Sequence, residues 1–356
     1  MNIPEKMNAL VLHGKNDLRF EEVPVPGIET DEVLVKIDTC TICGTDPHIL
    51  HGDFPGFWPK EFPLILGHEW SGTIAGTGEK AALFGWKEGD RICGSCHVGC
   101  GYCSMCLSGR YNLCLNYGHD ELGHRQYGHY LPGSFAQYYR TSVKGISRMP
   151  DNIDLKLGAL IDPLSVALHT VRRSNIEAGK TVLVNGTGPL GLLAIKLAQA
   201  MGAGKVIAAG SGTRLDFARE LGALCIDYRK DDVPAKVAEF TGCLGAHSVV
   251  ESAGTPKSLI NACMSVAHGG TISLLGIPQE DVALPMKQIV LYEVEIVGNR
   301  ANPNCAKDAI QMVAEGRVSI DDIMTHEFSM KDYKEAFETF MKRLDNSIKV
   351  GIHPND

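Results

Sequence analysis

The stretch VLVNGTGPLGLLAIKLAQAMGA, residues 182–203, decides the fold of this chain. It starts as a short apolar run typical of a buried strand, turns through three glycines, and continues with the apolar spacing of a helix. A second apolar run, KVIAAG at residues 205–210, follows at once. The order strand, glycine turn, helix, strand predicts a βαβ unit, in which a helix connects two parallel strands.

This context turns an otherwise weak glycine pattern into a predicted dinucleotide-binding site. Gly186 permits the tight turn, Gly188 lets the backbone approach a pyrophosphate, and Gly191 lets the helix pack close to the strand. The helix that starts at Pro189 and Leu190 would offer its free backbone N–H groups to the phosphates. A plain strand-to-helix turn is the alternative interpretation.

The end of the second strand indicates which dinucleotide binds. NAD sites usually end this strand with Asp or Glu, which binds the ribose hydroxyls. Here residues 208–214 read AAGSGTR and contain no carboxylate. Ser211 and Arg214 could instead accept a 2′-phosphate through hydroxyl and charge-assisted hydrogen bonds. The sequence therefore predicts a preference for NADP(H) over NAD(H). The alternative is that Arg214 is solvated and NAD binds without its acid.

The rest of the chain shows two different patterns of apolar and turn residues. Strand-like runs at residues 247–254, 269–277 and 294–298 alternate with helical patterns, which predicts a doubly wound parallel sheet with helices on both faces. The first third instead reads as short strands separated by turn residues and predicts a β-rich unit with long loops. The fold class is therefore α/β, with two domains expected for 356 residues.

Composition excludes several function classes. The net charge of −8 argues against a nucleic-acid partner, because phosphate binding normally needs a basic surface. No apolar run reaches the roughly 18 residues of a membrane span, and the N-terminus lacks the pattern of a signal peptide. We therefore expect a cytoplasmic protein without membrane contact. In a reducing cytosol its 12 cysteines are expected to bind metal rather than to form disulfides.

A cysteine-rich lobe carries the strongest metal pattern. Its spacing is C-x2-C-x2-C-x7-C, formed by Cys100, Cys103, Cys106 and Cys114. Four thiolates make a closed tetrahedral zinc site of the structural type. A bacterial ferredoxin has three residues before its last cysteine and then proline, whereas here the last gap is seven residues and Leu115 follows. Spacing alone leaves the ligand set open, since Cys93 and Cys96 form another CxxC pair and His97 follows them.

Three more segments carry a family resemblance when they are combined with the glycine motif and the cysteine lobe. They are CTICGTDPH at residues 40–48, GHEWSGTIAGTG at 67–78 and ALIDPLSVALH at 159–169. Together they resemble the zinc-dependent medium-chain alcohol dehydrogenases, most nearly the sorbitol/polyol dehydrogenase branch. The second segment is similar to the family's GHE-x-x-G signature. The third is similar to a polyol-branch segment that usually has Glu, not Asp, before Pro-Leu-Ser. The resemblance runs from about residue 7 to 353.

The resemblance implies a domain organisation. A GroES-like catalytic domain would comprise residues 1–155, completed by 300–356, with a Rossmann dinucleotide-binding domain, residues 156–299, inserted. The active site would lie in the cleft between the two domains. The family's structural-zinc spacing favours the four-cysteine set named above over Cys93, Cys96 and His97. Two zinc ions per chain and a homodimer or homotetramer are expected.

It also implies a catalytic zinc site. Cys43 and His68 resemble the constant ligands, and Glu69 corresponds to a residue that is a ligand in some states of the family. Asp162 stands where relatives have Cys, Asp or Glu. Its side chain is one methylene shorter than Glu, so direct ligation and a water bridge both stay open. Asp46 would orient a ligand imidazole.

The implied reaction is reversible oxidation of a secondary alcohol or polyol to a ketone, with hydride passing to NADP. Thr45 and His48 resemble the hydroxyl and imidazole that carry the proton to solvent, and Arg300 resembles an arginine near the substrate or the nicotinamide. Phe57 and Trp58 either line the substrate pocket or anchor their loop. The alternatives are a threonine- or 2,3-butanediol-type dehydrogenase, possibly NAD-dependent, a zinc-ribbon binding protein, or a zinc-free quinone reductase.

Overall fold

The computed structural model describes residues 3–54 and 57–356, and the chain divides into two compact units. Unit 1 comprises Met1–Asp162, Ala306–Ala314 and Ile320–Asp356. Unit 2 comprises Pro163–Cys305 and Glu315–Ser319. The two domain ranges expected from the sequence, 1–155 with 300–356 and 156–299, stay predictions.

Unit 1 is built on a sheet of strand order β10-β6-β5-β3-β18-β17, in which β9 also pairs with β3. Its strands are β3 (Glu32–Thr41), β5 (Glu69–Thr77), β6 (Arg91–Gly94), β9 (Tyr138–Ser142), β10 (Ile146–Arg148), β17 (Met324–Ser329) and β18 (Lys349–His353). A second sheet has the order β2-β1-β4, from β1 (Lys6–Gly14), β2 (Asp17–Pro24) and β4 (Leu64–Ile65). A short ribbon pairs β7 (His97–Val98) with β8 (Arg125–Gln126).

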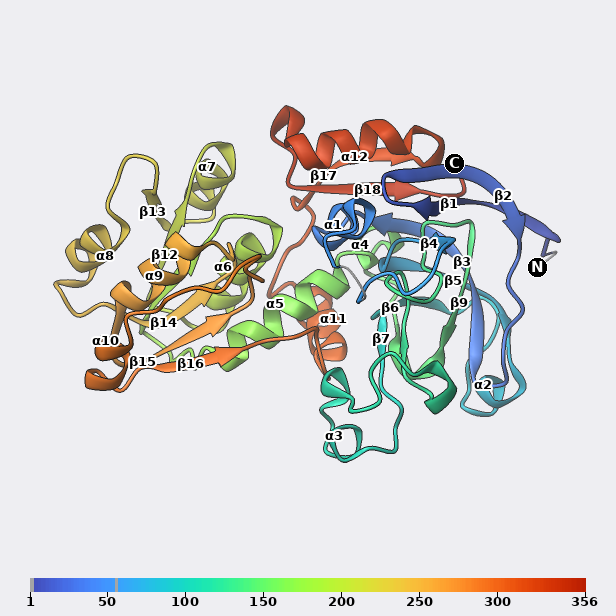
Figure 1. Cartoon of the computed structure of the whole chain (residues 1–356), viewed down its shortest axis with the longest axis horizontal. Helices are drawn as coiled ribbons and strands as arrows, with labels where there is room; N and C mark the ends of the chain where they lie inside the picture. The colour runs from blue at the N-terminus through green and yellow to red at the C-terminus, as the bar shows by residue number, and fades with distance from the viewer. Residues whose placement is uncertain (1–2, 55–56) are drawn as a thin grey trace. The chain divides into compact units, whose positions relative to one another are not determined.

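The last segment of the chain completes unit 1. β18 pairs antiparallel with β3, with Ile352 opposite Cys40, so a red strand from the end of the chain lies beside a blue one from its start (Figure 1). Apolar side chains of both segments share one core, in which Ile37, Trp70 and Val350 are fully buried. The C-terminal strand is therefore an integral part of the β-rich unit, because its apolar residues are buried in that unit's core.

The helices of unit 1 are short and connect or cover its strands. They are α1 (Thr45–His51), α2 (Glu79–Leu83), α3 (Ser104–Leu107), α4 (Leu155–Gly158), α11 (Ala306–Ala314) and α12 (Tyr333–Lys342). The apolar residues of 155–174 have helical spacing, and the structure divides this segment between α4 and α5 (Ile161–Arg173). The boundary between the units falls inside α5, after Asp162.

Unit 2 is a parallel sheet of order β13-β12-β11-β14-β15-β16. Its strands are β11 (Thr181–Asn185), β12 (Lys205–Gly210), β13 (Leu224–Asp227), β14 (Ala246–Glu251), β15 (Val266–Leu274) and β16 (Glu295–Gly298), and its helices after α5 are α6 (Pro189–Ala200), α7 (Thr213–Glu220), α8 (Val233–Thr241), α9 (Pro256–Ser265) and α10 (Met286–Leu291). The order reverses between β11 and β14, which makes their carboxyl ends the topological switch point where such sheets bind ligands. The predicted parallel sheet is confirmed.

Within the described residues, no helix combines the length and the apolar character needed to cross a bilayer.

Candidate metal centres and dinucleotide turn

Strand pairing in unit 1 brings the first predicted metal cluster together. β3 and β5 run antiparallel with Thr41 opposite Glu69, so the loop after β3 and the residues before β5 meet at one end of the sheet. Cys43, His68 and Glu69 each present a ligand atom there, and these atoms all lie within 4.8 Å of one another. His68 and Glu69 are buried, and Cys43 is partly exposed. Sulfur, nitrogen and oxygen donors in this arrangement fit a zinc ion.

Asp46 ties the Cys43 loop to His68. Its Oδ2 accepts a hydrogen bond from the backbone N–H of Cys43 at 2.8 Å, and its Oδ1 lies 3.4 Å from Nδ1 of His68. Burial alone would lower the pKa of His68, but the negative charges of Asp46 and Cys43 outweigh it and raise the pKa well above its usual value. A buried imidazole with a carboxylate on one side and a thiol on the other is the usual arrangement for a metal-binding histidine.

Glu69 has two buried partners that fix its carboxylate. Oε2 accepts a hydrogen bond from Oγ1 of Thr41 at 2.5 Å and lies 2.5 Å from Nζ of Lys349. Burial opposes the charge on Lys349, yet the Glu69 carboxylate holds the pKa of that ammonium above its usual value. Sequence reasoning did not identify Lys349. The only signal is a lysine inside the apolar run IKVGI, at residues 348–352.

Asp162 is the second residue of α5 and is buried, but it is not one of the three clustered residues. Burial raises the pKa of the Cys96 thiol to about 12, where Asp162 adds to the rise and His68 opposes it. Cys43 and Glu69 also raise it. Cys96 is thus within electrostatic reach of Asp162 and of the cluster alike.

The four cysteines of the lobe have the spacing of a tetrahedral metal site. Sγ of Cys100 lies 3.8 Å from Sγ of Cys106, and Sγ of Cys103 lies 3.9 Å from Sγ of Cys114. Sulfurs bound to zinc at about 2.3 Å stand about 3.8 Å apart at the corners of a tetrahedron. A disulfide would need about 2 Å, and every cysteine of the chain is free of one. The lobe therefore fits zinc.

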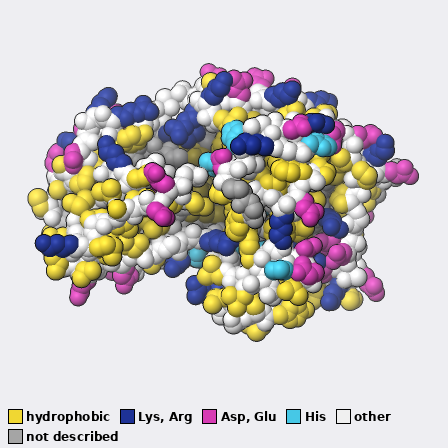
Figure 2. All heavy atoms as spheres, viewed as in Figure 1, with side chains coloured by type: hydrophobic (Ala, Val, Ile, Leu, Met, Phe, Trp, Pro, Cys, Tyr) yellow, Lys and Arg dark blue, Asp and Glu magenta, His cyan; other side chains and the backbone are white. Residues whose placement is uncertain are grey.

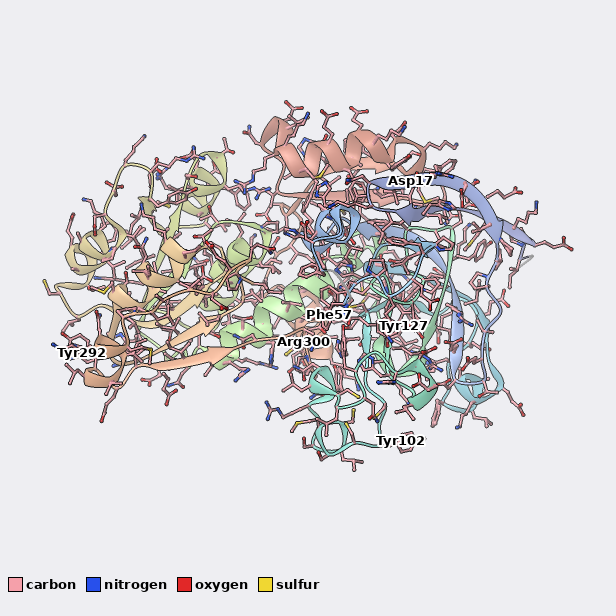
Figure 3. All side chains as sticks on the ribbon, viewed as in Figure 1. Asp17, Phe57, Tyr102, Tyr127, Tyr292 and Arg300 are labelled. Carbon is pink, nitrogen blue, oxygen red and sulfur yellow. The ribbon has the colours of Figure 1, made fainter. Side chains whose placement is uncertain are left out.

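Backbone amides support a thiolate at Cys100, whereas burial raises the pKa of Cys106 and of Cys114. Burial alone would raise the pKa of Cys100, but the N–H groups of Tyr102 and Cys103 each donate to its Sγ at 3.4 Å and lower the pKa to about 6. Figure 3 labels Tyr102 in this lobe, beside α3. The competing candidates are placed elsewhere. Cys93 lies in β6, and neither it nor Cys96 belongs to the four-cysteine cluster.

The glycine turn joins β11 to α6 at the switch point of the parallel sheet. Gly186 has a φ of 108°, which favours glycine. A Cβ on Gly191 would lie 1.9 Å from the carbonyl oxygen of Gly186, so only glycine lets the helix approach. A Cβ on Gly188 would meet no atom within 4 Å, which leaves room beside the turn. α6 then starts at Pro189 and Leu190. This open cradle at a helix N-terminus fits a dinucleotide pyrophosphate.

The residues predicted to select the cofactor gather at the end of β12. Ser211 follows this strand, and its Oγ donates a hydrogen bond to Oη of Tyr228 at 3.2 Å. Arg214 is the second residue of α7. Tyr228 follows β13, a four-residue strand that the sequence analysis did not predict, and two basic residues, Arg229 and Lys230, come next.

The predicted proton-transfer residues lie on α1. Oγ1 of Thr45 is 3.7 Å from Sγ of Cys43. Nδ1 of His48 is 2.8 Å from a carboxylate oxygen of Asp53, and 44% of the His48 side chain is exposed. Sequence reasoning missed Asp53. Arg300 lies in unit 2, just after β16.

Aromatic side chains of unit 1 adjoin the first cluster. Trp58 is nearly buried and donates from Nε1 to Oη of Tyr117 at 2.7 Å, and Phe57, labelled in Figure 3, stacks on Tyr117. The Trp58 ring also packs edge-on against His129, whose ring centroid lies 4.5 Å from that of His68. Trp58 is thus linked to the cluster through His129, which the sequence analysis missed.

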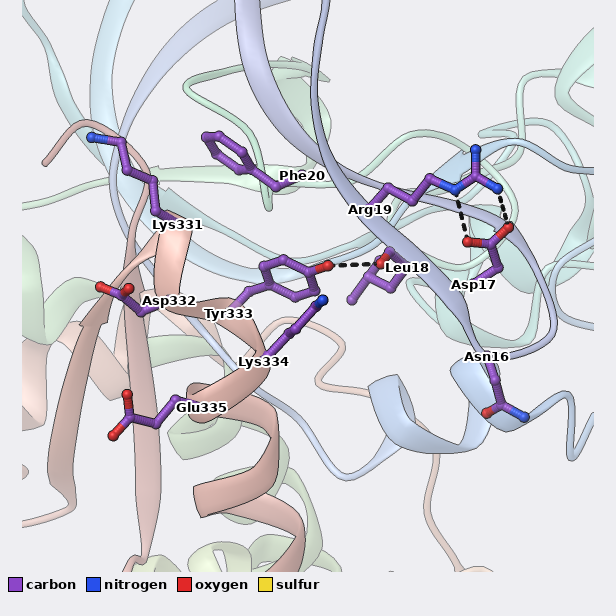
Figure 4. Close-up of a pocket in the computed structure, with 10 residues that line it drawn as sticks. All are labelled: Asn16, Asp17, Leu18, Arg19, Phe20, Lys331, Asp332, Tyr333, Lys334 and Glu335. Atoms are coloured by element: carbon purple, nitrogen blue, oxygen red, sulfur yellow. Dashed lines mark hydrogen bonds and ion pairs between the residues drawn. The ribbon is translucent and has the colours of Figure 1, made fainter.

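A separate groove of about 750 Å³ lies between β2 and the start of α12 (Figure 4). Within it Asp17 binds Arg19 through both carboxylate oxygens, and Oη of Tyr333 donates to the carbonyl of Leu18 at 2.9 Å. None of the predicted site residues line this groove. Its volume therefore does not mark the reaction site.

Known proteins resemble this chain over nearly its whole length. Residues 29–151 match the alcohol dehydrogenase GroES-like domain, and residues 189–315 match the zinc-binding dehydrogenase domain. Sorbitol dehydrogenase of Bacillus subtilis (strain 168) is 33% identical over 99% of both chains. Sorbitol dehydrogenase of Bos taurus is 34% identical over 99% of this chain and 98% of its own.

Solved structures agree with this similarity. A protein assigned as a zinc-binding dehydrogenase from Sinorhizobium meliloti 1021, solved bound to NADP, superposes with a TM-score of 0.90 at 31% identity, covering 99% of this chain and 100% of that one. 2R,3R-butanediol dehydrogenase from Bacillus subtilis gives a TM-score of 0.88 at 30% identity, over 98% and 100%.

These matches confirm the predicted fold class, a GroES-like β-rich domain together with a Rossmann-type parallel sheet. They also confirm an enzyme of the alcohol and polyol dehydrogenase kind that uses zinc and a nicotinamide cofactor. The chain therefore belongs to the zinc-dependent medium-chain alcohol dehydrogenase family, in its polyol dehydrogenase branch.

Proposed function

We propose that this enzyme transfers hydride between a secondary alcohol or polyol and NADP(H), at a zinc ion held by Cys43 and His68. The observation that carries the proposal is the convergence of Cys43, His68 and Glu69 within 4.8 Å in a largely buried position. Two sorbitol dehydrogenases at 33–34% identity support a polyol as the substrate class.

A zinc ion held by Cys43 and His68 would supply Lewis-acid chemistry, and a nicotinamide cofactor at the glycine turn would supply hydride chemistry. The chain's own residues hold the site and move the proton. Asp46 orients His68, and the Thr45 hydroxyl beside Cys43 would take the alcohol's proton while releasing its own toward His48. His48 then passes it to solvent, for which its 44% exposure suits it.

Asp53 prepares His48 for this role. A carboxylate only accepts hydrogen bonds, so the proton in the 2.8 Å contact belongs to Nδ1 of His48. In the neutral ring Nε2 is then the acceptor, the state required of a proton-receiving group. We accordingly assign Thr45 and His48 to proton transfer, Asp53 to positioning, and Arg300 to the nicotinamide or substrate.

The preference for NADP(H) rests on the end of β12. No carboxylate is present between Ala208 and Arg214 to repel a 2′-phosphate. Ser211 and Tyr228 form a hydroxyl pair there, and Arg214 offers a positive charge. The Sinorhizobium meliloti relative, which was solved with NADP, supports the same assignment.

A second zinc ion per chain belongs in the lobe of Cys100, Cys103, Cys106 and Cys114, where four sulfurs leave no position for substrate. We assign it a structural role. Asp162 completes or borders the first site. The free state of all the cysteines supports a reducing, cytoplasmic location.

We also propose a homodimer or homotetramer. β16 lies at an edge of its sheet, and an open edge can pair with a second copy. Exposed apolar side chains cluster on α9 and α10 nearby, where Figure 2 shows hydrophobic surface: Ile260, Met264, Met286, Val290 and Leu291.

Metal analysis with matched cysteine variants tests the two zinc roles. The purified enzyme should contain two zinc ions per chain. Cys43→Ser should lose one zinc and turnover yet still bind cofactor, because the Rossmann unit is untouched. Cys100→Ser should lower the temperature of unfolding instead. Retained turnover in Cys43→Ser would contradict the first site, and a well-folded but inactive Cys100→Ser would mean that the roles are exchanged.

A substrate panel tests the reaction, with cofactor reduction followed by absorbance. Sorbitol and related polyols should be oxidised with higher kcat/KM for NADP than for NAD. The similarity to 2R,3R-butanediol dehydrogenase makes a 2,3-butanediol-type activity the second candidate, so butanediol and threonine belong in the panel. A clear preference for NAD would overturn the cofactor assignment without affecting the zinc sites.

A further inference from the structure

The side-chain position of Gly210 is already occupied by Thr187. Gly210 is the last residue of β12, and Thr187 is the buried middle residue of the glycine turn. A Cβ added to Gly210 would lie 2.2 Å from Oγ1 of Thr187, 2.6 Å from its Cγ2 and 2.9 Å from its Cβ. Carbon atoms in favourable contact stand about 3.5–4.0 Å apart. No side chain fits at Gly210 while Thr187 is in place.

Rotation of Thr187 does not open the space. Turning χ1 moves Oγ1 and Cγ2, but the Cβ of Thr187 stays at 2.9 Å. The backbone on both sides is also anchored. The N–H of Gly186 donates to the carbonyl of Ala209 at 2.9 Å, and the N–H of Tyr228 donates to the carbonyl of Gly210 at 3.1 Å. The contact therefore persists unless the Thr187 side chain is removed or the turn moves.

Gly210 is also the place where the cofactor is selected. It ends the second strand of the βαβ unit, where NAD sites present a carboxylate to the ribose hydroxyls. We propose that Thr187 is a specificity-determining residue: by filling the side-chain space of Gly210, it excludes a carboxylate from the strand end and keeps the site suited to a dinucleotide with a 2′-phosphate. This inference rests on the proposed NADP(H) preference.

The inference predicts that Gly210→Asp alone does not create an NAD site. The new side chain would collide with Thr187, so the variant should unfold at lower temperature and bind both NADH and NADPH poorly. Removing the obstacle first should change this outcome. In Gly210→Asp combined with Thr187→Gly, the carboxylate can occupy the strand end and accept ribose hydrogen bonds.

A double-mutant cycle tests the coupling. The four proteins are the unchanged enzyme, Thr187→Gly, Gly210→Asp and the double variant. The unfolding temperature without cofactor measures the cost of the steric clash, and nucleotide fluorescence gives the Kd of NADH and of NADPH. The double variant should unfold at a higher temperature than Gly210→Asp and bind NADH at least about tenfold more tightly, the scale of one hydrogen bond to a charged group. Gly210→Asp combined with Thr187→Ala should have an unfolding temperature and an NADH affinity between those of Gly210→Asp and of the double variant, because alanine keeps the Cβ.

Gly298→Asp is the matched control. Gly298 ends β16 of the same sheet, and a Cβ there would meet no atom within 4 Å. Its effect on unfolding should be the same with and without Thr187→Gly, which separates a specific collision from the general cost of Asp at a strand end.

Two results would overturn the inference. One is an equal loss of stability from Gly210→Asp with and without Thr187→Gly. The other is a relief of that loss with no gain in NADH binding, since the closed space would then not be what excludes NAD. The kcat/KM ratio of the unchanged enzyme for the two cofactors is read separately. A higher kcat/KM of the unchanged enzyme for NAD would contradict the proposed NADP(H) preference. The double-mutant cycle tests the role of Thr187 separately.

Discussion

Asp46 connects the two parts of the chain that form the first metal cluster. One oxygen of its buried carboxylate holds the backbone of Cys43, and the other faces His68. A residue of this kind decides where the imidazole points and which nitrogen carries the proton. The sequence analysis expected this role only from the family resemblance of residues 40–48.

Replacing Asp46 by Asn tests that role. The amide oxygen can still accept from the N–H of Cys43, but the charge facing His68 is gone. We expect zinc affinity at this site to fall by about 10–100-fold, while the lobe keeps its zinc. Competition with a chromophoric chelator measures the loss. Asp38→Asn, an exposed change on β3, should leave both affinities unchanged, and equal losses in the two variants would refute the assignment.

Other residues near the candidate sites had little or no signal in the sequence. Asp53, His129, Tyr228 and Lys349 are ordinary loop or strand residues until tertiary contacts place them. Lys349 meets Glu69 only because β18 returns to β3. Tyr228 meets Ser211 because two parallel strands end side by side. Local pattern reveals a ligand motif, but it does not reveal partners that depend on strand pairing.

Among the strands, those with a continuous run of apolar residues could be predicted from the sequence. β11, β12 and β14 are largely buried strands whose apolar residues are Val, Leu, Ile and Ala, and the sequence located each of them. β2 and β13 were missed. β2 is half-exposed and alternates apolar with charged residues, and β13 has only four residues at a sheet edge. Edge strands bury too little surface to leave a strong pattern.

β18 contributes a buried ion pair as well as a strand. Lys349→Met should destabilise the enzyme by about 3–5 kcal/mol, because it leaves the buried carboxylate of Glu69 without its counter-charge. Denaturant unfolding measures the change. The double variant Lys349→Met with Glu69→Gln should recover part of the loss, and a double variant as unstable as the sum of the single ones would contradict the pairing.

The same pair gives a pH dependence with a definite sign. The pKa of Lys349 is raised in the folded chain above its usual value of 10.5. The stabilisation is therefore fully present below about pH 10.5 and is lost as the pH rises through the higher folded value. As the pH rises from neutral to strongly alkaline, the denaturant concentration at the midpoint of unfolding should fall more steeply for the unchanged enzyme than for Lys349→Met.

For the whole molecule, the two metal clusters should respond differently to zinc removal. In the proposed assignment the Cys43 cluster serves chemistry on a framework of paired strands, whereas the four-cysteine lobe, which has little regular structure, would depend on its metal to hold its shape. Limited chelation should abolish turnover while the unfolding temperature holds. Removal of the second zinc should then lower that temperature. Simultaneous loss of turnover and stability at one zinc equivalent would contradict this order.

The closing of β18 onto β3 has a consequence during synthesis. The ribosome makes Glu69 early and Lys349 only after the whole of unit 2 has been translated. At the usual rates this delay is on the order of tens of seconds. Unit 2 can fold within that interval. The Glu69 carboxylate of the first metal cluster, however, lacks the charge of Lys349 until β18 emerges. The nascent chain should therefore bind dinucleotide before its catalytic centre is complete.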